Sequence, residues 1–314
     1  MHIHRDIAAL RSDFPAQRRL QAAFKRASDA WHLSEPVAEV RRALAGYADD
    51  GVLANHLTLA NLVSNHAAAQ SFADGFIVRF VRALRAQPLG EVPFGHSTGA
   101  GFSRMQLLNC GGATLSICAF EKRPEADPPQ AVRFVDCETH EIILAGSAQG
   151  TLYRRVGTLT CEDREWRAGD VISCQAMTGS RHVQKVDSTL LVLQLTRKPV
   201  RPTPSLELRL TDGALLREVS GDKCASEQVM ALCVLGALGS DPAPLVQFAR
   251  DTGHDREARW EALRQVLSID SARGFALLCE IAGEQADTLA RPAADLRAKL
   301  AADYPQLRLL AEAI

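Results

Sequence analysis

The spacing of apolar residues changes twice along this chain. Before about residue 90, apolar side chains recur every three or four positions, as in Val37, Val40, Leu44 and Tyr47, which is the spacing of one helix face. The middle of the chain holds short runs rich in Val, Ile, Leu and Thr, separated by Gly, Pro or charged residues. Helical spacing resumes from Ser226. The pattern predicts helices, then strands, then helices again.

The strand-like runs of the middle third follow one another closely. They lie at 105–108, 114–120, 131–135, 140–144, 151–156, 171–174, 182–186 and 190–195. Many short strands at such spacing are typical of a β-sandwich or a β-barrel. Two further runs, 206–210 and 214–219, predict a final pair of strands.

Gly and Pro residues cluster where the apolar spacing changes. They cluster between residues 90 and 101, and Pro202 and Pro204 follow the last closely spaced strand runs. We therefore predict an α+β fold with an N-terminal helical region at 1–90, a β domain at 91–220 and a C-terminal helical domain at 221–314. The apolar stripes of the last part are typical either of HEAT-like helical hairpins or of a generic helical bundle, and both stay open.

Composition limits the classes of partner. The 314 residues include 36 basic and 37 acidic ones, with a formal net charge of −1, so no overall field favours nucleic acid or an anionic membrane. No apolar run approaches the roughly 18 residues of a membrane span, and residues 1–6 lack the apolar core of a signal peptide. We expect a cytoplasmic protein with no nucleic-acid and no membrane partner. The eight cysteines form no CxxC pair, which favours small core residues over a disulfide framework.

The stretch from Gly169 to His182 resembles the second sequence motif of the cupin superfamily, the RmlC-type barrels. Gly169-Asp170 follows a polar turn and opens a strand run, and Gly179-x-x-His182 has the spacing that closes the motif. The usual Pro is missing and two extra residues separate the two halves. The resemblance covers residues 104–197. It implies a central cupin-like antiparallel β-barrel in a bacterial-type protein, and it implies a homodimer.

The first cupin motif is degenerate in this chain. Counting back from either Gly146 or Gly150 places no histidine pair at the family's ligand positions. Glu138 and His140 lie nearby, and strand alternation puts both side chains on one face. With His182, they are the residues that the resemblance implies for a ligand site. The same His182, His140 and Glu138 are the candidate ligands of a divalent metal, either Fe, Ni, Mn or Zn.

Alternation also separates two neighbouring side chains of the second motif. Arg181 and His182 must face opposite sides of a regular strand. If His182 points into the barrel, Arg181 points outward, so we predict an external salt bridge for Arg181.

Three functions remain open. The leading hypothesis is a cupin-like protein that binds a small-molecule ligand, with regulation as one form of that role and with a degenerate metal site. The second is a metal-dependent cupin enzyme, such as an oxygenase, with His182 and His140 at its centre. The third is a protein-interaction adaptor that uses the C-terminal helices. An enzyme needs convergent donors, a ligand sensor needs a pocket, and an adaptor needs an exposed apolar groove.

Overall fold

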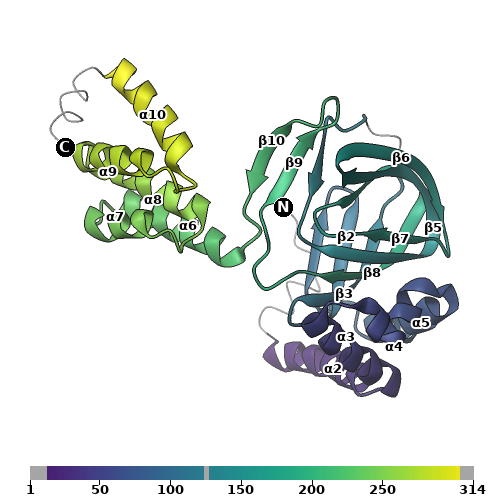
Figure 1. Ribbon diagram of the computed structural model, residues 1–314. Coiled ribbons are helices and arrows are strands. Elements are labelled where there is room, and N and C mark those ends of the chain that lie inside the picture. Colours follow the sequence, from purple (N-terminus) through teal and green to yellow (C-terminus); the bar gives the residue numbers. More distant parts are fainter. Residues whose placement is uncertain (1–12, 124–126, 305–314) are drawn as a thin grey trace. The chain divides into compact units, whose positions relative to one another are not determined.

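A computed structural model describes residues 13–123 and 127–304 (Figure 1). The chain divides into two compact units, residues 1–218 and 219–314. The first unit combines a helical layer with two β-sheets, and the second is mainly helical. The mixed helical and antiparallel architecture that the sequence predicted is confirmed. The three-part division at 90 and 220 stays a prediction.

The helical layer of the first unit lies between residues 14 and 86. It consists of α2 (Phe14–His32), α3 (Glu35–Asp50), the short 3-10 helix η1 (Leu53–Asn55), α4 (Leu57–Ser64) and α5 (His66–Ala86). The Asp13 side chain accepts a hydrogen bond from the Ala16 backbone N–H, and Asn65 does the same for α5, so both helices begin at a capping residue. Helix α3 ends at Gly51, whose φ of 69° is the left-handed conformation that favours glycine.

Ten strands build the two sheets of the described chain. They are β1 (His96–Gly99), β2 (Phe102–Cys110), β3 (Ala113–Phe120), β4 (Ala131–Phe134), β5 (Glu138–Val156), β6 (Thr158–Arg167), β7 (Val171–Cys174), β8 (Gly179–Arg197), β9 (Ser205–Arg209) and β10 (Leu215–Val219). The larger sheet has the order β1-β2-β3-β8-β5-β6, with β7 beside β5, and the smaller sheet has the order β10-β9-β4.

The larger sheet curls but does not close. Strands β1 and β6 are the two ends of its order, so the closed barrel of the sequence prediction is wrong for the described strands. The curl arises in β5 and β8, which shift register several times between Ile143 and Gly150. At Gly146 the φ is 90°, and an added Cβ would lie 2.2 Å from the Thr189 carbonyl oxygen. A glycine at this position therefore lets the two long strands bend together.

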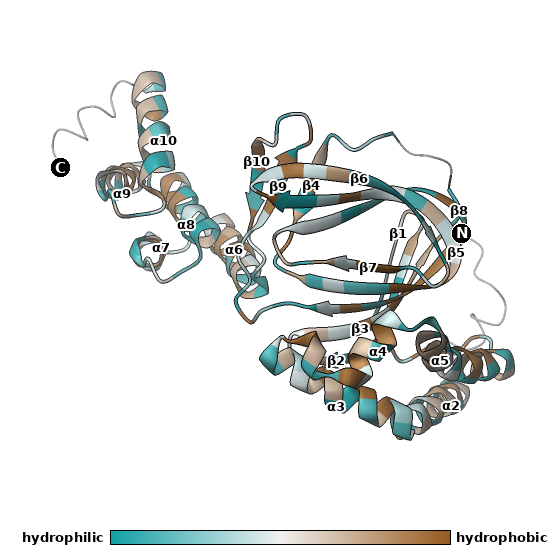
Figure 2. Cartoon of the chain, turned by 45° about the vertical axis from the view of Figure 1, so that its right-hand side comes forward, coloured by the Kyte–Doolittle hydropathy of each residue, from teal (hydrophilic) through white to brown (hydrophobic). Residues whose placement is uncertain are grey.

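The curled sheet has two different faces. On the helix-facing side, Ile142, Leu193 and Leu195 pack against α2–α5 in one apolar core. The figures place these helices beside β2 and β3 (Figure 2). On the interior side, Ile143, Val192 and others form a second cluster. Because successive strand residues point to opposite faces, Ile142 and Ile143 belong to different cores.

The second unit contains five helices in its described part. They are α6 (Lys223–Ala237), α7 (Pro242–Arg250), α8 (Arg256–Ile269), α9 (Ser271–Gly283) and α10 (Ala290–Asp303). An aspartate caps each of the first four through a backbone N–H: Asp222, Asp241, Asp255 and Asp270. Whether the helices form HEAT-like pairs stays a prediction. Across the described residues of both units, we find no helix with the length and apolar character of a membrane span.

Candidate functional site

A buried ion pair crosses the interior of the curled sheet. The Nε and Nη2 atoms of Arg181 each donate a hydrogen bond to one carboxylate oxygen of Glu141. The Gln194 amide donates a further hydrogen bond to this carboxylate at 2.6 Å. Glu141 stands beside Gln194 in the sheet, whereas Arg181 stands beside Leu152, far along β5. The ion pair therefore joins two parts of the sheet that the curl brings face to face.

The surroundings of Arg181 favour its charged form. Burial works against the guanidinium charge, but the adjacent Glu141 carboxylate holds the pKa of Arg181 above its ordinary value. The guanidinium also lies 5.3 Å from the centre of the Phe120 ring. Only 1% of the Glu141 side chain is exposed, so Arg181 and Gln194 take the place of water around its carboxylate.

Two interior cysteines lie close to the same carboxylate. Burial, and then the Glu141 charge, raises the pKa of Cys118 to about 12 and that of Cys174 to about 11. Both thiols are therefore protonated at neutral pH. Because the thiolate is the form that attacks a substrate or binds a metal, neither cysteine is an activated group.

Arg181 and His182 have the opposite placement to the one predicted. Arg181 points into the interior, so the prediction of an external salt bridge is wrong. Val183 belongs to the interior cluster, and His182 between these two residues points to the other face. Burial, followed by the charges of Arg123 and Arg181, lowers the pKa of His182, which favours a neutral ring. Its Nε2 atom is buried and has no hydrogen-bond partner among the described residues.

Glu138 and His140 meet as predicted, but on the helix-facing side. The Nε2 atom of His140 lies 3.1 Å from a Glu138 carboxylate oxygen, and its Nδ1 atom lies 3.1 Å from the Ser173 hydroxyl on β7. The other Glu138 oxygen accepts a 2.9 Å hydrogen bond from the Tyr47 hydroxyl on α3. These four side chains, Tyr47, Glu138, His140 and Ser173, form one hydrogen-bonded relay.

The relay leads from the core to the surface. Tyr47 is fully buried and His140 is 8% exposed, whereas Ser173 is exposed. Burial and the hydrogen bond to Glu138 raise the pKa of Tyr47, so the phenol remains a proton-bearing donor at neutral pH.

These positions do not fit the metal centre that the family resemblance implied. His182 stands opposite Thr151, well beyond His140 along β5, and it points to neither the interior ion pair nor the relay. Both ring nitrogens of His140 already have hydrogen-bond partners. In the described part of the chain, no group of three or more His, Cys, Asp or Glu side chains could hold a metal ion. The structure thus brings together two of the three candidate ligands.

A cleft of about 310 Å³ lies where β5, β7 and the start of β8 meet. We call it the end cleft, and it is lined by Leu152, Tyr153, Arg154, Val156, Ser173, Cys174, Gln175, Thr178, Gly179 and Ser180. Its Ser173 is the exposed end of the relay. Arg154 is exposed, its charge lies near Cys174, and no ion pair joins it to a described residue.

Tight backbone geometry shapes one wall of the end cleft. Gly179 leaves no room for a side chain, since an added Cβ would lie 2.7 Å from the Gln175 backbone nitrogen. Met177 has a φ of 59°, which is uncommon for a residue other than glycine. The Thr178 carbonyl oxygen accepts a 2.8 Å hydrogen bond from the Arg155 N–H, which fixes this loop to β5. The glycine of the second cupin-like motif thus has a structural role beside the cleft.

Sequence reasoning missed Arg154, Ser173 and Tyr47 as site residues. Ser173 lies inside the stretch that carries the family resemblance, and strand alternation from Ile172 was the available signal for its exposure. Tyr47 lies 91 positions before Glu138, so no local pattern connects the two. Arg154 pairs with Gly179 of β8 and Ser173 pairs with His140 of β5, so the two residues share the end cleft only through the fold.

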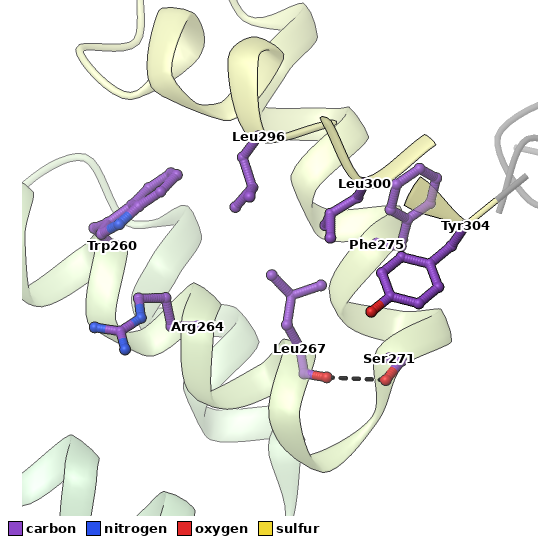
Figure 3. Close-up of a pocket in the computed structure, with 8 residues that line it drawn as sticks. All are labelled: Trp260, Arg264, Leu267, Ser271, Phe275, Leu296, Leu300 and Tyr304. Atoms are coloured by element: carbon purple, nitrogen blue, oxygen red, sulfur yellow. Dashed lines mark hydrogen bonds between the residues drawn. The ribbon is translucent and has the colours of Figure 1, made fainter. Parts of the chain in front are cut away.

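The second unit has an apolar groove of about 730 Å³ between α8, α9 and α10 (Figure 3). Its lining residues are Trp260, Arg264, Leu267, Ser271, Phe275, Leu296, Leu300 and Tyr304. The Ser271 hydroxyl is bound to the Leu267 carbonyl oxygen at 3.0 Å, so most of the remaining lining is apolar. An exposed apolar groove is the feature that the adaptor hypothesis requires.

No protein-family model matches this chain, and no curated protein matches it. Among solved structures, it is similar to the 7S globulin of Momordica charantia, with 16% identity, a TM-score of 0.28, and coverage of 38% of this chain and 36% of that one. Oxalate decarboxylase of Lactobacillus farciminis, in a formate complex, gives 14% identity, a TM-score of 0.27, and coverage of 39% and 38%. The chain therefore spans less than two fifths of the length of either protein.

A third similar structure is a putative mannose-6-phosphate isomerase from Ralstonia eutropha, with 17% identity, a TM-score of 0.26, and coverage of 35% of this chain and 94% of that one. Cupin-fold proteins are thus among the structural neighbours. The chain is similar to them over roughly a third of its length, at TM-scores too low to carry any conclusion about its site or its activity.

Proposed function

We propose that the first unit binds a small molecule with an anionic group in the end cleft. The observation that carries this proposal is the exposed, unpaired guanidinium of Arg154 on the wall of a cleft of about 310 Å³. Ligand pockets typically begin at roughly 300 Å³, so the ligand would be small. A planar guanidinium binds a carboxylate or a phosphate through two parallel hydrogen bonds.

The rest of the lining supports the same type of ligand. Ser173, Thr178 and Ser180 offer hydroxyl groups, and Gln175 offers an amide. Leu152 and Val156 offer apolar contacts. The ligand would therefore combine an anionic end with a compact body that carries hydrogen-bonding groups.

The interior ion pair is a weaker candidate for the binding group. Glu141 and Arg181 already satisfy each other, with Gln194 as a third partner. An incoming anion would have to separate a buried pair and leave Glu141 without its cation. Arg154 needs no such rearrangement, so the proposal rests on the end cleft.

The test is the affinity of an Arg154→Gln variant for small anions. We expect isothermal titration calorimetry of the wild-type protein to detect at least one of acetate, succinate, citrate, inorganic phosphate and glucose 6-phosphate. Loss of a charged hydrogen-bond donor costs about 1.5–3 kcal/mol, so the variant should bind that anion at least roughly tenfold more weakly. The matched control is Arg164→Gln, which removes an exposed arginine paired with Glu162 on β6. Binding by none of the five anions, or equal affinity in wild type and Arg154→Gln, contradicts the proposal.

The metal-dependent enzyme stays a prediction of the family resemblance, and the described donors do not support it. Elemental analysis of protein purified without an affinity tag tests it directly, because a stoichiometric metal that a His182→Ala variant loses would restore it. The adaptor hypothesis has the groove of the second unit in its favour. The regulatory role, the homodimer and the cytoplasmic location also stay predictions.

A further inference from the structure

We infer that Ser173 is a nucleophile that attacks small carboxylic esters in the end cleft. The inference rests on the cleft of the proposed function but not on its anion. The relay supplies each part that such a serine needs, which are an adjacent base, a group that orients the base, and access to a cleft.

The hydrogen bonds determine which ring nitrogen of His140 can act as the base. An ionised Glu138 carboxylate only accepts hydrogen bonds, so the His140 Nε2 atom, 3.1 Å away, carries the proton. In the neutral ring, Nδ1 then has a free lone pair directed at the Ser173 hydroxyl, 3.1 Å away. Ser173 donates to this nitrogen, as a serine does to its general base.

Tyr47 positions the carboxylate that orients the base. Its hydroxyl donates to the second Glu138 oxygen at 2.9 Å, and Tyr47 is a fully buried residue of α3. The Arg197 guanidinium lies 5.9 Å from the centre of the Tyr47 ring. Glu138 thus has a partner on each oxygen, which holds the His140 ring in one orientation. Tyr47 and Glu138 are positioning residues, because neither touches the substrate.

The relay runs from buried residues to an exposed serine, and a nucleophile must be accessible to its substrate. Tyr47 and His140 are buried, whereas Ser173 is exposed and lines the end cleft. In addition, β7 pairs only with β5 among the described strands, so its outer edge presents backbone N–H groups beside Ser173. Such groups can stabilise the negative charge that develops on an ester oxygen.

The reaction balances with an ester and water as its reactants. The Ser173 Oγ atom forms a bond to the carbonyl carbon, and its proton passes to His140 Nδ1. The ester C–O bond then breaks, and the leaving alcohol takes that proton. Water attacks the acyl-serine in the same way, which releases a carboxylic acid and restores Ser173. The product is an anion of the class that we assign to Arg154.

The test is covalent labelling of Ser173. We expect a neutral alkyl fluorophosphonate to label the wild-type protein, and peptide mass spectrometry to find the label on Ser173. The Ser173→Ala variant should lose the label and should not release nitrophenol from p-nitrophenyl acetate above the rate in buffer. The control is Ser64→Ala, which removes an exposed serine bound to the Ala60 carbonyl oxygen and should label as wild type does. An unlabelled Ser173 in the folded wild-type protein overturns the inference.

The roles of His140 and Glu138 need their own variants. General-base catalysis contributes about 10²–10⁴-fold, so His140→Gln should slow labelling at least roughly a hundredfold. Glu138→Gln keeps the side-chain shape and should change the pH profile of labelling, because the amide no longer fixes the proton on Nε2. Circular dichroism shows whether each variant is folded, and a folded His140→Gln that labels at the wild-type rate overturns the role of His140. Because calorimetry reports the anion site and labelling reports the nucleophile, either proposal can fail without the other.

Discussion

Adjacent residues of β5 serve two different structures. His140 points to the helix-facing side and joins the relay, whereas Glu141 points to the interior and binds Arg181. Alternation, which predicted that Glu138 and His140 share a face, is confirmed by their 3.1 Å contact. The sequence could not show which face would be covered by helices, because that depends on packing between residues far apart in the chain. For the same reason, His182 was assigned to the interior and Arg181 to the outside.

Glu141 allows the stability of the interior to be tested at a single residue. Removal of one partner of a buried ion pair costs about 3–5 kcal/mol, so Glu141→Gln should lower the free energy of unfolding by that amount. The control is Glu165→Gln, since Glu165 pairs with Arg167 at an exposed position and should contribute less than about 1 kcal/mol. Urea denaturation measures both variants. Equal losses of stability in the two would contradict a stabilising role for the interior ion pair.

At the scale of elements, apolar spacing predicted the shorter helices and strands well. The stripe from Val37 to Tyr47 lies within α3, and the run at 114–120 lies within β3. The pattern failed for β6, because most of its residues are exposed and polar, so no apolar alternation marks it. It also failed for β1, an exposed strand in the Gly-rich stretch that the sequence marked as a transition. It also split β5 and β8 into separate runs, since the glycines and polar residues that bend each strand look like breaks in a linear sequence.

The bend of β5 can be tested by a pair of glycine substitutions. Gly146→Ala places a Cβ against the Thr189 carbonyl oxygen at a φ of 90°. We therefore expect it to lower the free energy of unfolding by at least about 1–3 kcal/mol. Gly75→Ala, in the interior of α5, meets no atom within 4 Å and should stabilise the first unit by about 0.4–1 kcal/mol. Thermal denaturation followed by circular dichroism compares the two. An unchanged stability of Gly146→Ala would show that the bend does not depend on glycine.

At the scale of the whole molecule, each unit has a core and a buried ion pair of its own. In the second unit, Arg259 binds Asp287 with both terminal nitrogens, at 3.0 and 2.5 Å, and their side chains are 2% and 7% exposed. Arg181 and Glu141 form the corresponding buried ion pair of the first unit. Substitutions in the two pairs can therefore test the stability of each unit separately.

The pH dependence of the second unit should follow Asp287. Hydrogen bonds from Arg259 hold the pKa of Asp287 below its usual 3.8. A carboxyl group with a lowered pKa stabilises the fold above its unfolded-state pKa, and this stability is lost as the pH falls through the folded-state pKa. We expect Asp287→Asn to lower the free energy of unfolding of the second unit by about 3–5 kcal/mol at pH 7. In acid, the stabilities of the variant and the wild type should become more similar, because the wild-type carboxyl group is then protonated.

Chemical denaturation followed by circular dichroism measures this effect at pH 7 and at successive pH values below 4. The control is Glu280→Gln, which removes an exposed partner of Arg250. The denaturation step that Glu141→Gln shifts should be unchanged in Asp287→Asn. A loss shared by both steps would mean that the two units do not unfold independently.

The helical layer over the first sheet has a practical consequence for dissecting the chain. A fragment that began at His96 would retain every strand, yet its Leu115, Leu193 and Leu195 would lose their apolar neighbours from α2–α5. It would also leave Glu138 without the phenol that holds it in place. Such a fragment should self-associate through its uncovered leucines, and its His140 ring should lose its fixed orientation. The strands and residues 14–86 should therefore be expressed together, as one folding unit.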